Sequence, residues 1–148
     1  MTGKSSAGLT LMELVFILAI IGVLAAVFIP SYADYTHRLQ ASEAVALMSD
    51  AKTPLAEYFA DRKKWPESLA NLKLPTSGKY TQSVLISKGA GGSGELELTA
   101  TMKSEGVDRR VTGQSVRLAT KDGGRTWICS PGTMELKNLP SQCRPESK

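Results

Sequence analysis

The chain has 148 residues, of which 42% are hydrophobic and 22% are charged, and its formal net charge at pH 7 is +4. These values exclude a disordered polymer and a collagen-like fibre, and two cysteines are too few for a disulfide-dense miniprotein. With a single histidine besides, the sequence offers little material for a zinc site, and we expect no metal or cofactor.

The first predicted element is an apolar helix over residues 9–29, from Leu9 to Ile29. At about 1.5 Å per residue it reaches roughly 31 Å, which matches the hydrocarbon core of a bilayer. A helix satisfies its own backbone hydrogen bonds in lipid, and Gly22 and Pro30 are tolerable in such a span. We therefore predict that this segment crosses a membrane.

Three interpretations of this segment remain open. A Sec signal peptide would be cleaved near Ser31-Tyr32-Ala33, although the apolar run exceeds the usual length of about 7–15 residues. An ordinary single-span anchor is the second interpretation. The third gives Glu13 a function, because a carboxylate inside an apolar helix is costly and needs a positive partner. No Lys or Arg lies between Lys4 and Arg38, so that partner is not a side chain of the same segment.

Cleavage of the chain after Gly8 would supply the missing cation. The new amino group on Leu9 would lie four residues before Glu13 in the sequence. The carboxylate would then pair with its own terminus or with that of a neighbouring subunit.

The sequence AGLTLME at residues 7–13, followed by the apolar run, resembles the class III signal of type IV prepilins. The resemblance implies that residues 1–8 are a leader peptide and that a prepilin peptidase cuts between Gly8 and Leu9. The same enzyme would then methylate the amino terminus of Leu9, and Glu13 would determine assembly and methylation. The family's usual phenylalanine after the cut is replaced by Leu9, which keeps the apolar character.

An amphipathic helix is predicted to continue over residues 30–59. Its apolar side chains recur at helical spacing and form one stripe: Ala41, Val45, Met48, Leu55 and Phe59. Pro54 predicts either a kink or a restart of the helix with Thr53 as its cap. His37 lies just beyond the apolar segment, and we expect it to be solvated.

Residues 60–79 are predicted to form a loop with one short turn near residues 67–72, because prolines and glycines interrupt regular structure there. The basic run Arg62-Lys63-Lys64 has two interpretations. It would contact DNA or an anionic surface, or it would be a solvated turn beside Trp65 as a packing anchor. We favour the solvated turn.

From Tyr80 onward the periodicity changes to that of strands. Residues 95–102 alternate strictly between polar and apolar. Three shorter runs are also predicted as strands: Tyr80–Ser87, Ser115–Thr120 and Thr126–Ser130. The glycine-rich residues 89–94 and 122–124 are predicted hairpin turns, and the first lacks the Lys-Ser or Lys-Thr of a phosphate-binding loop. The antiparallel sheet of residues 80–148 needs a cover on one face, which the helical stripe provides.

Cys129 and Cys143 are expected to form a structural disulfide that bounds the loop 129–143. A reactive or metal-binding pair is the alternative, but the spacing without a nearby histidine in the sequence is unfavourable for it. The expected fold class is therefore α+β. A long N-terminal helix, membrane-spanning and then amphipathic, packs on a four-stranded antiparallel sheet that ends in a disulfide loop.

The resemblance extends into this second part of the chain. Gly78-Lys79-Tyr80, Trp127-Ile128-Cys129 and LPSQCR at residues 139–144 are similar to landmarks in the head domain of type IVa major pilins. The resemblance implies that residues 60–79 are the αβ-loop and that residues 129–143 are the D-region.

No candidate active site is found in the sequence, since no nucleophile is paired with a base, and we expect no enzymatic activity. The resemblance implies a structural subunit of a type IV pilus, polymerising through its N-terminal helix into a filament for adhesion, twitching motility or DNA uptake. In that filament Glu13 would pair with the Leu9 amino group of an adjacent subunit. Gly22 and Pro30 would bracket a segment able to lose helicity.

The resemblance also implies partners and a location. The partners are further copies of the chain, a prepilin peptidase and methyltransferase, the inner membrane and the pilus assembly machinery. The precursor is expected in the inner membrane as a single-pass protein with its head in the periplasm. The mature protein is expected in the extracellular pilus.

Three alternatives remain. A type II secretion pseudopilin shares the N-terminal signal, although the Cys129–Cys143 loop argues against it. A minor DNA-receptor pilin would bind DNA weakly and in a salt-sensitive manner, because the positive excess is small. Its basic stripe would comprise Arg109, Arg110, Arg117, Lys121 and Arg125. A secreted soluble domain would have its mature N-terminus near Asp34.

Overall fold

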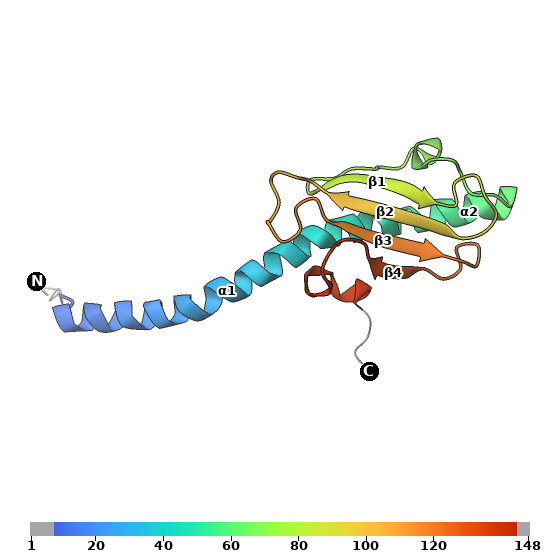
Figure 1. Ribbon diagram of the computed structural model, residues 1–148. Helices are drawn as coiled ribbons and strands as arrows, with labels where there is room; N and C mark the ends of the chain where they lie inside the picture. Colours follow the sequence, from blue (N-terminus) through green and yellow to red (C-terminus); the bar gives the residue numbers. More distant parts are fainter. Residues whose placement is uncertain (1–7, 145–148) are drawn as a thin grey trace, which may run out of the picture. The chain divides into compact units, whose positions relative to one another are not determined.

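The computed structural model describes residues 8–144 of the chain (Figure 1). The chain divides between Tyr35 and Thr36 into two compact units, an N-terminal helical segment and a head. Except for Gly8, the predicted leader lies outside the described residues, as does the end of the chain after Arg144.

Helix α1 extends from Leu11 to Asp50 and belongs to both units. Pro30 lies inside it without ending the helix. The N–H that Pro30 lacks would have bonded the carbonyl of Ala26, so this turn has one hydrogen bond fewer than its neighbours. The apolar segment predicted over residues 9–29 is thus helical from Leu11 onward.

Helix α2 follows from Lys52 to Arg62, and Pro54 accounts for the break before it. Without an N–H, Pro54 cannot bond the carbonyl of Asp50, which is the last residue of α1. Pro54 instead lies in the first turn of α2, where N–H groups have no partner within the helix. The predicted restart is confirmed, but the N-cap residue is Ala51 and not Thr53.

The apolar stripe predicted on the second half of the helix is confirmed. Its members Ala41, Val45, Met48 and Leu55 are at most 4% exposed, and Phe59 is partly buried against the same core. The prediction that His37 is solvated is wrong, since its side chain is only 1% exposed. The loop between the second and third strands covers it, with Arg110 Nη1 3.1 Å from His37 Nδ1.

The head contains an antiparallel sheet of four strands in the order β1-β2-β3-β4. The strands are β1 (Thr81–Lys88), β2 (Leu96–Met102), β3 (Ser115–Thr120) and β4 (Ile128–Pro131). Leu98 on β2 lies opposite Ile86 on β1 and Leu118 on β3, so apolar side chains align across the sheet. Each predicted strand is present, with ends shifted by no more than a few residues.

The core lies between one face of this sheet and the helices. The apolar side chains of β2 are fully buried: Leu96, Leu98, Ala100 and Met102. They join the helical stripe in one hydrophobic cluster, and Figure 1 shows α2 and the end of α1 behind the strands. The amphipathic helix therefore covers the sheet as predicted.

Both glycine-rich segments are turns between antiparallel strands, as predicted. The first joins β1 to β2 and begins at Gly89, whose φ is +86°. A Cβ at Gly89 would lie 1.9 Å from the carbonyl oxygen of Glu95, so only glycine fits this position.

A disulfide joins Cys129 on β4 to Cys143 in the short helix η3 (Ser141–Cys143). It attaches the end of the described chain, including the short helix η2 (Leu136–Asn138), to the last strand. With this disulfide present, the predicted α+β fold is confirmed as a long N-terminal apolar helix, a four-stranded antiparallel sheet and a C-terminal disulfide.

Candidate functional site

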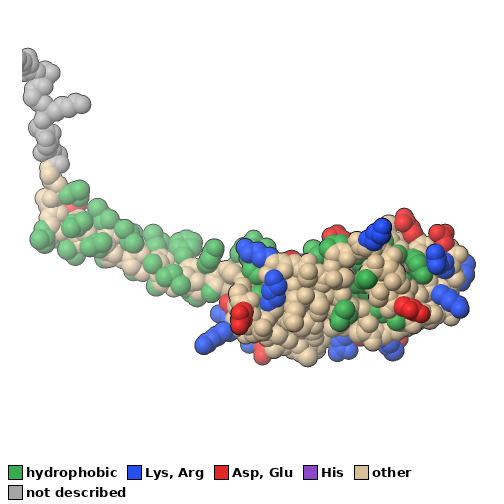
Figure 2. All heavy atoms as spheres, turned by 90° about the horizontal axis from the view of Figure 1, so that it is seen from above, with side chains coloured by type: hydrophobic (Ala, Val, Ile, Leu, Met, Phe, Trp, Pro, Cys, Tyr) green, Lys and Arg blue, Asp and Glu red, His purple; other side chains and the backbone are tan. Residues whose placement is uncertain are grey.

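The N-terminal part of α1 exposes a continuous apolar surface. From Leu9 to Ile29, the large hydrophobic side chains are between 43% and 82% exposed. Figure 2 shows hydrophobic side chains covering this part of the helix. Among residues 8–144, there is one candidate for a membrane-spanning helix by length and composition, and it lies within the helical run Leu11–Arg62 that α1 and α2 form. A patch of this size on a protein surface marks contact with a membrane or with another protein.

The beginning of α1 is fixed by a hydrogen-bonded cap. The Thr10 hydroxyl oxygen accepts the N–H of Glu13 at 3.3 Å, and the N–H of Leu14 donates to the Thr10 carbonyl at 3.1 Å. The Thr10 hydroxyl also donates to Glu13 Oε2 at 3.5 Å. Thr10 is therefore the N-cap, and the sequence T-x-x-E is the pattern of such caps. The sequence analysis missed this role of Thr10, although the pattern was present.

This cap places the Glu13 carboxylate in the first helical turn, where the positive end of the helix dipole favours an anion. The carboxylate is exposed, and so are Gly8 and Leu9, which lie just before the helix begins. The structure thus holds the predicted processing residues and Glu13 at one end of the apolar surface.

Gly22 and Pro30 lie farther along α1. No atom outside the helix backbone lies within 4 Å of a Cβ added at Gly22, so close packing within the subunit does not require a glycine there. The Ser31 hydroxyl donates to the carbonyl of Val27 at 3.4 Å, next to the weakened turn at Pro30. The two residues are predicted weak points on one continuous helix.

The loop after α2 is anchored to the β1–β2 turn through Trp65. The Trp65 side chain is 1% exposed. Its indole N–H donates to the Gly94 carbonyl at 2.8 Å, and its backbone N–H donates to the Gly92 carbonyl at 2.7 Å. The neighbouring residues 62–64 are exposed. The predicted packing anchor at Trp65 is confirmed, and we still favour a solvated turn for the exposed basic run.

The other end of this loop is attached to α1 by Glu43. Its two carboxylate oxygens accept the backbone N–H groups of Lys79 and Tyr80. Gly78 precedes them, and a Cβ there would lie 1.8 Å from Glu43 Oε1. A hydrogen bond with Tyr80 raises the pKa of the Lys79 ammonium above its usual value. Sequence reasoning found the Gly78-Lys79-Tyr80 landmark but gave no reason for it.

Three of the five basic residues considered as a DNA-binding stripe lie beside carboxylates, and one of them, Arg110, is 3.9 Å from Asp108. Arg117 is 3.9 Å from Glu97, and Lys121 is 3.9 Å from Glu95. These carboxylates reduce the positive potential that a phosphate backbone would meet. Within the described part of the chain, no group of three or more His, Cys, Asp or Glu side chains is arranged to hold a metal ion.

Asp122, in the turn between β3 and β4, has a pKa well below its usual value. Hydrogen bonds from the hydroxyl and the N–H of Thr126 lower its pKa to about 2, with further bonds from the Thr120 hydroxyl and the Arg125 N–H. The ionised side chain therefore orders this turn.

Comparison with known proteins gives consistent results. A model of the pilin family, described as a bacterial filament protein, matches residues 38–144. The chain is 43% identical to fimbrial protein EcpC of Eikenella corrodens over 141 residues. This alignment covers 93% of this chain and 90% of that protein. Type IV major pilin protein PilE1 of Neisseria gonorrhoeae is 36% identical, and the alignment covers 93% of this chain and 86% of that protein. A fimbrial protein of Neisseria meningitidis serogroup A is 38% identical, with 93% of each chain covered.

Proposed function

Since the chain belongs to the type IV pilin family, we propose that a prepilin peptidase cuts it between Gly8 and Leu9 and methylates the new terminus. The protein is a structural subunit of a type IV pilus and polymerises with copies of itself. The pilin family consists of structural proteins. The names of the relatives favour this function over a secretion pseudopilin or a DNA receptor.

The observation that carries the proposed mechanism is the exposed carboxylate of Glu13 at the start of an exposed apolar helix. In the precursor this helix anchors the protein in a membrane, and we place the head on the periplasmic side. During assembly the apolar surface exchanges lipid for the helices of other subunits. Lipid tails are as apolar as these side chains, so the exchange by itself provides little driving force and no register.

A charge pair provides the register that apolar packing lacks. Cleavage creates an ammonium group on Leu9, and the Glu13 carboxylate of an adjacent subunit is its partner. Inside a filament core the effective dielectric constant is lower than in water, which strengthens the attraction. An unpaired charge there is costly, so a subunit placed out of register is disfavoured.

The same logic assigns a role to Gly22 and Pro30. Glycine weakens a helix through its backbone freedom, and Pro30 removes one hydrogen bond. The segment between them is therefore the part of the apolar helix that opens at least cost when subunits pack in the filament. The contacts of the filament would compensate for the lost helical bonds.

The pairing role is tested with Glu13→Ala produced together with wild-type subunits. We expect the variant to insert into the membrane and to be cleaved, since neither step uses the pair, but to be absent from filaments. Glu13→Asp keeps the charge and is the matched control, which should be incorporated in part. Mass spectrometry of sheared filaments gives the ratio of the two subunits. Normal incorporation of Glu13→Ala would reject the pairing.

A further inference from the structure

Two guanidinium groups from distant parts of the chain meet in the head. Arg38 lies on α1, and its Nε donates to the carbonyl of Lys137 at 3.2 Å. Arg144, at the end of the described chain, donates to the same carbonyl through Nη2, also at 3.2 Å. Because both groups bind one oxygen atom, they are immediate neighbours.

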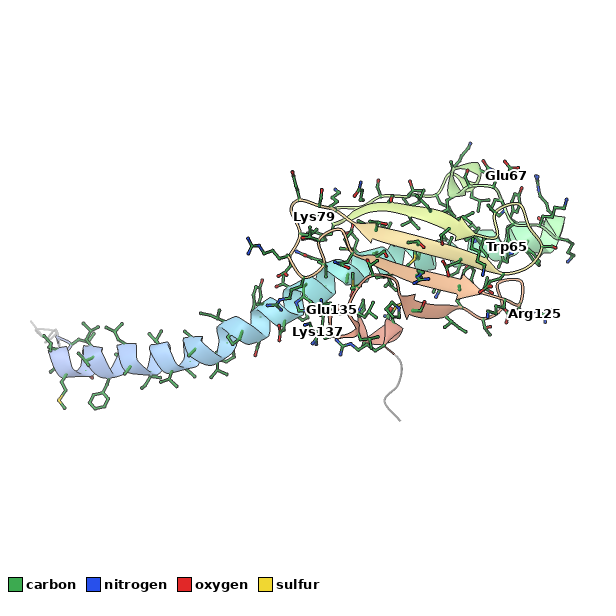
Figure 3. The ribbon with its side chains drawn as sticks, in the orientation of Figure 1. Trp65, Glu67, Lys79, Arg125, Glu135 and Lys137 are labelled. Atoms are coloured by element: carbon green, nitrogen blue, oxygen red, sulfur yellow. A yellow bond between two sulfur atoms is a disulfide. The ribbon has the colours of Figure 1, made fainter. Side chains whose placement is uncertain are left out.

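These two positive charges have no carboxylate partner among the described residues of the head. Lys137 pairs with Glu135 at 2.7 Å on the η2 turn, where Figure 3 labels both residues. Neither Arg38 nor Arg144 forms an ion pair with a carboxylate in the part of the chain that the structure describes. Both side chains are partly exposed.

Both guanidinium groups also retain unused donors. Each carries five N–H donors in a planar fork. Arg38 uses one donor, its Nε, for the Lys137 carbonyl. Arg144 uses two donors, Nε for the Leu139 carbonyl at 3.0 Å and Nη2 for the Lys137 carbonyl. Phosphate oxygens are the ligands that match such forks in both geometry and charge.

The position of Arg38 along the chain brings this pair near a membrane surface. At about 1.5 Å per residue, roughly 14 Å of helix separates Arg38 from Ile29, the end of the apolar segment. Tyr32 and Tyr35 lie in between and are 73% and 62% exposed. Exposed tyrosines next to an apolar span are typical of the interface between membrane and water. Long arginine side chains extend toward that interface.

We propose that Arg38 and Arg144 bind the phosphate of an anionic phospholipid headgroup while the subunit is stored in the membrane. The proposal rests on the membrane-anchored precursor of the proposed function. Arg38 lies three residues after the boundary between the two units, so it belongs to the part of the head that is nearest in sequence to the membrane-spanning segment. The bound lipid is released when the subunit leaves the membrane for the filament.

The test uses the full-length protein in nanodiscs that contain equal amounts of phosphatidylglycerol and the zwitterionic phosphatidylethanolamine. After extraction into neutral detergent, native mass spectrometry counts the lipids that remain bound. Near a membrane surface each cation contributes about 1 kcal/mol, so the two arginines together correspond to roughly a thirtyfold preference for the anionic lipid. Equal retention of the two lipids by the wild-type protein would overturn the proposal, whatever the variants show.

Matched variants locate the site. Arg38→Gln combined with Arg144→Gln should abolish the preference. Arg117→Gln combined with Arg125→Gln removes the same charge from the sheet and the β3–β4 turn and should leave the preference intact. A preference that survives the first pair, or that the second pair also abolishes, would contradict the assignment.

Two further measurements keep the proposal testable if the first variant does not fold. A photoreactive phosphatidylglycerol should crosslink wild-type protein within residues 36–40 or 137–144, and crosslinks confined to other parts of the head would contradict the proposal. Replacing chloride with inorganic phosphate at constant ionic strength should not displace the lipid, and displacement would assign the site to soluble phosphate. Filament formation by the wild-type chain is scored separately, so its failure would count against the proposed function and not against the lipid site.

Discussion

A single carboxylate on α1 fixes the path of the loop that leads into the sheet. Glu43 accepts two consecutive backbone N–H groups, from Lys79 and Tyr80, and Gly78 leaves room for it. Hydrogen bonds to a charged acceptor are stronger than those between neutral groups. The Gly78-Lys79-Tyr80 landmark is therefore explained by a contact with a helix that lies far away in the sequence.

Replacing Gly78 with alanine tests this contact. The added Cβ would lie 1.8 Å from Glu43 Oε1, so we expect a loss of about 1–3 kcal/mol in the free energy of unfolding, measured in urea. Gly94→Ala is the control, because nothing lies within 4 Å of a Cβ there. In a Glu43→Ala background, Gly78→Ala should lower the free energy of unfolding by a much smaller amount. Equal costs in both backgrounds would show that Glu43 is not the source of the effect.

Asp122 predicts a dependence of stability on pH. Hydrogen bonds lower its pKa from 3.8 to about 2 in the folded protein, so the folded state favours the ionised form. The stabilisation is complete above about pH 4 and is lost as the pH falls through about 2. We expect the difference in Tm between wild-type protein and Asp122→Asn to shrink over that interval. A difference that stays constant from pH 5 to pH 2 would contradict this role.

The sequence predicts the surroundings of some single residues and not of others. Thr10 and Glu13 are three positions apart, so the helix cap they form was readable from the sequence alone. The burial of His37 was not readable, because it depends on Arg110, which is far along the chain. A histidine next to an arginine in the sequence is compatible with either environment.

Elements were predicted better than their ends. The alternation at residues 95–102 identified β2, and the helical stripe identified the face of α1 and α2 that is buried. The exact end of each strand depends on its pairing with a neighbour, as Ile128 on β4 does with Ala119 on β3. Periodicity in one segment contains no information about its partner.

The disulfide is the contact that attaches the last element to the sheet. Replacing both Cys129 and Cys143 with serine removes a cross-link over 14 positions of sequence. In the chain-entropy model the loss is about 3 kcal/mol of the free energy of unfolding. Urea denaturation of the full chain in detergent measures it, with the reduced wild-type protein for comparison. A loss well below 1 kcal/mol would show that η2 and η3 hold the end of the chain without the cross-link.

At the scale of the whole molecule, the two units have different relations to their surroundings. The head buries its own apolar side chains between helix and sheet, whereas the N-terminal helical segment buries almost none. The sequence predicted both properties. Apolar residues occur on every side of the first helical segment, whereas apolar and polar residues alternate along the elements of the second unit. The docking of Trp65 on the β1–β2 turn required the structure, since no local pattern links residues so far apart.

An isolated subunit therefore exposes an apolar surface that other subunits or lipid must cover. We propose that proteolysis after Gly8 converts a membrane anchor into an assembly element, because it creates the positive partner of Glu13. The chain from Leu9 to His37 contains no Lys or Arg, so no side chain of this segment supplies that partner.

The most direct test is mass spectrometry of the N-terminal peptide from purified filaments. The account predicts a peptide that begins at Leu9 and carries one methyl group on its amino nitrogen. A peptide that begins at Met1, or one that begins near Asp34 as a secreted soluble domain would, contradicts the account.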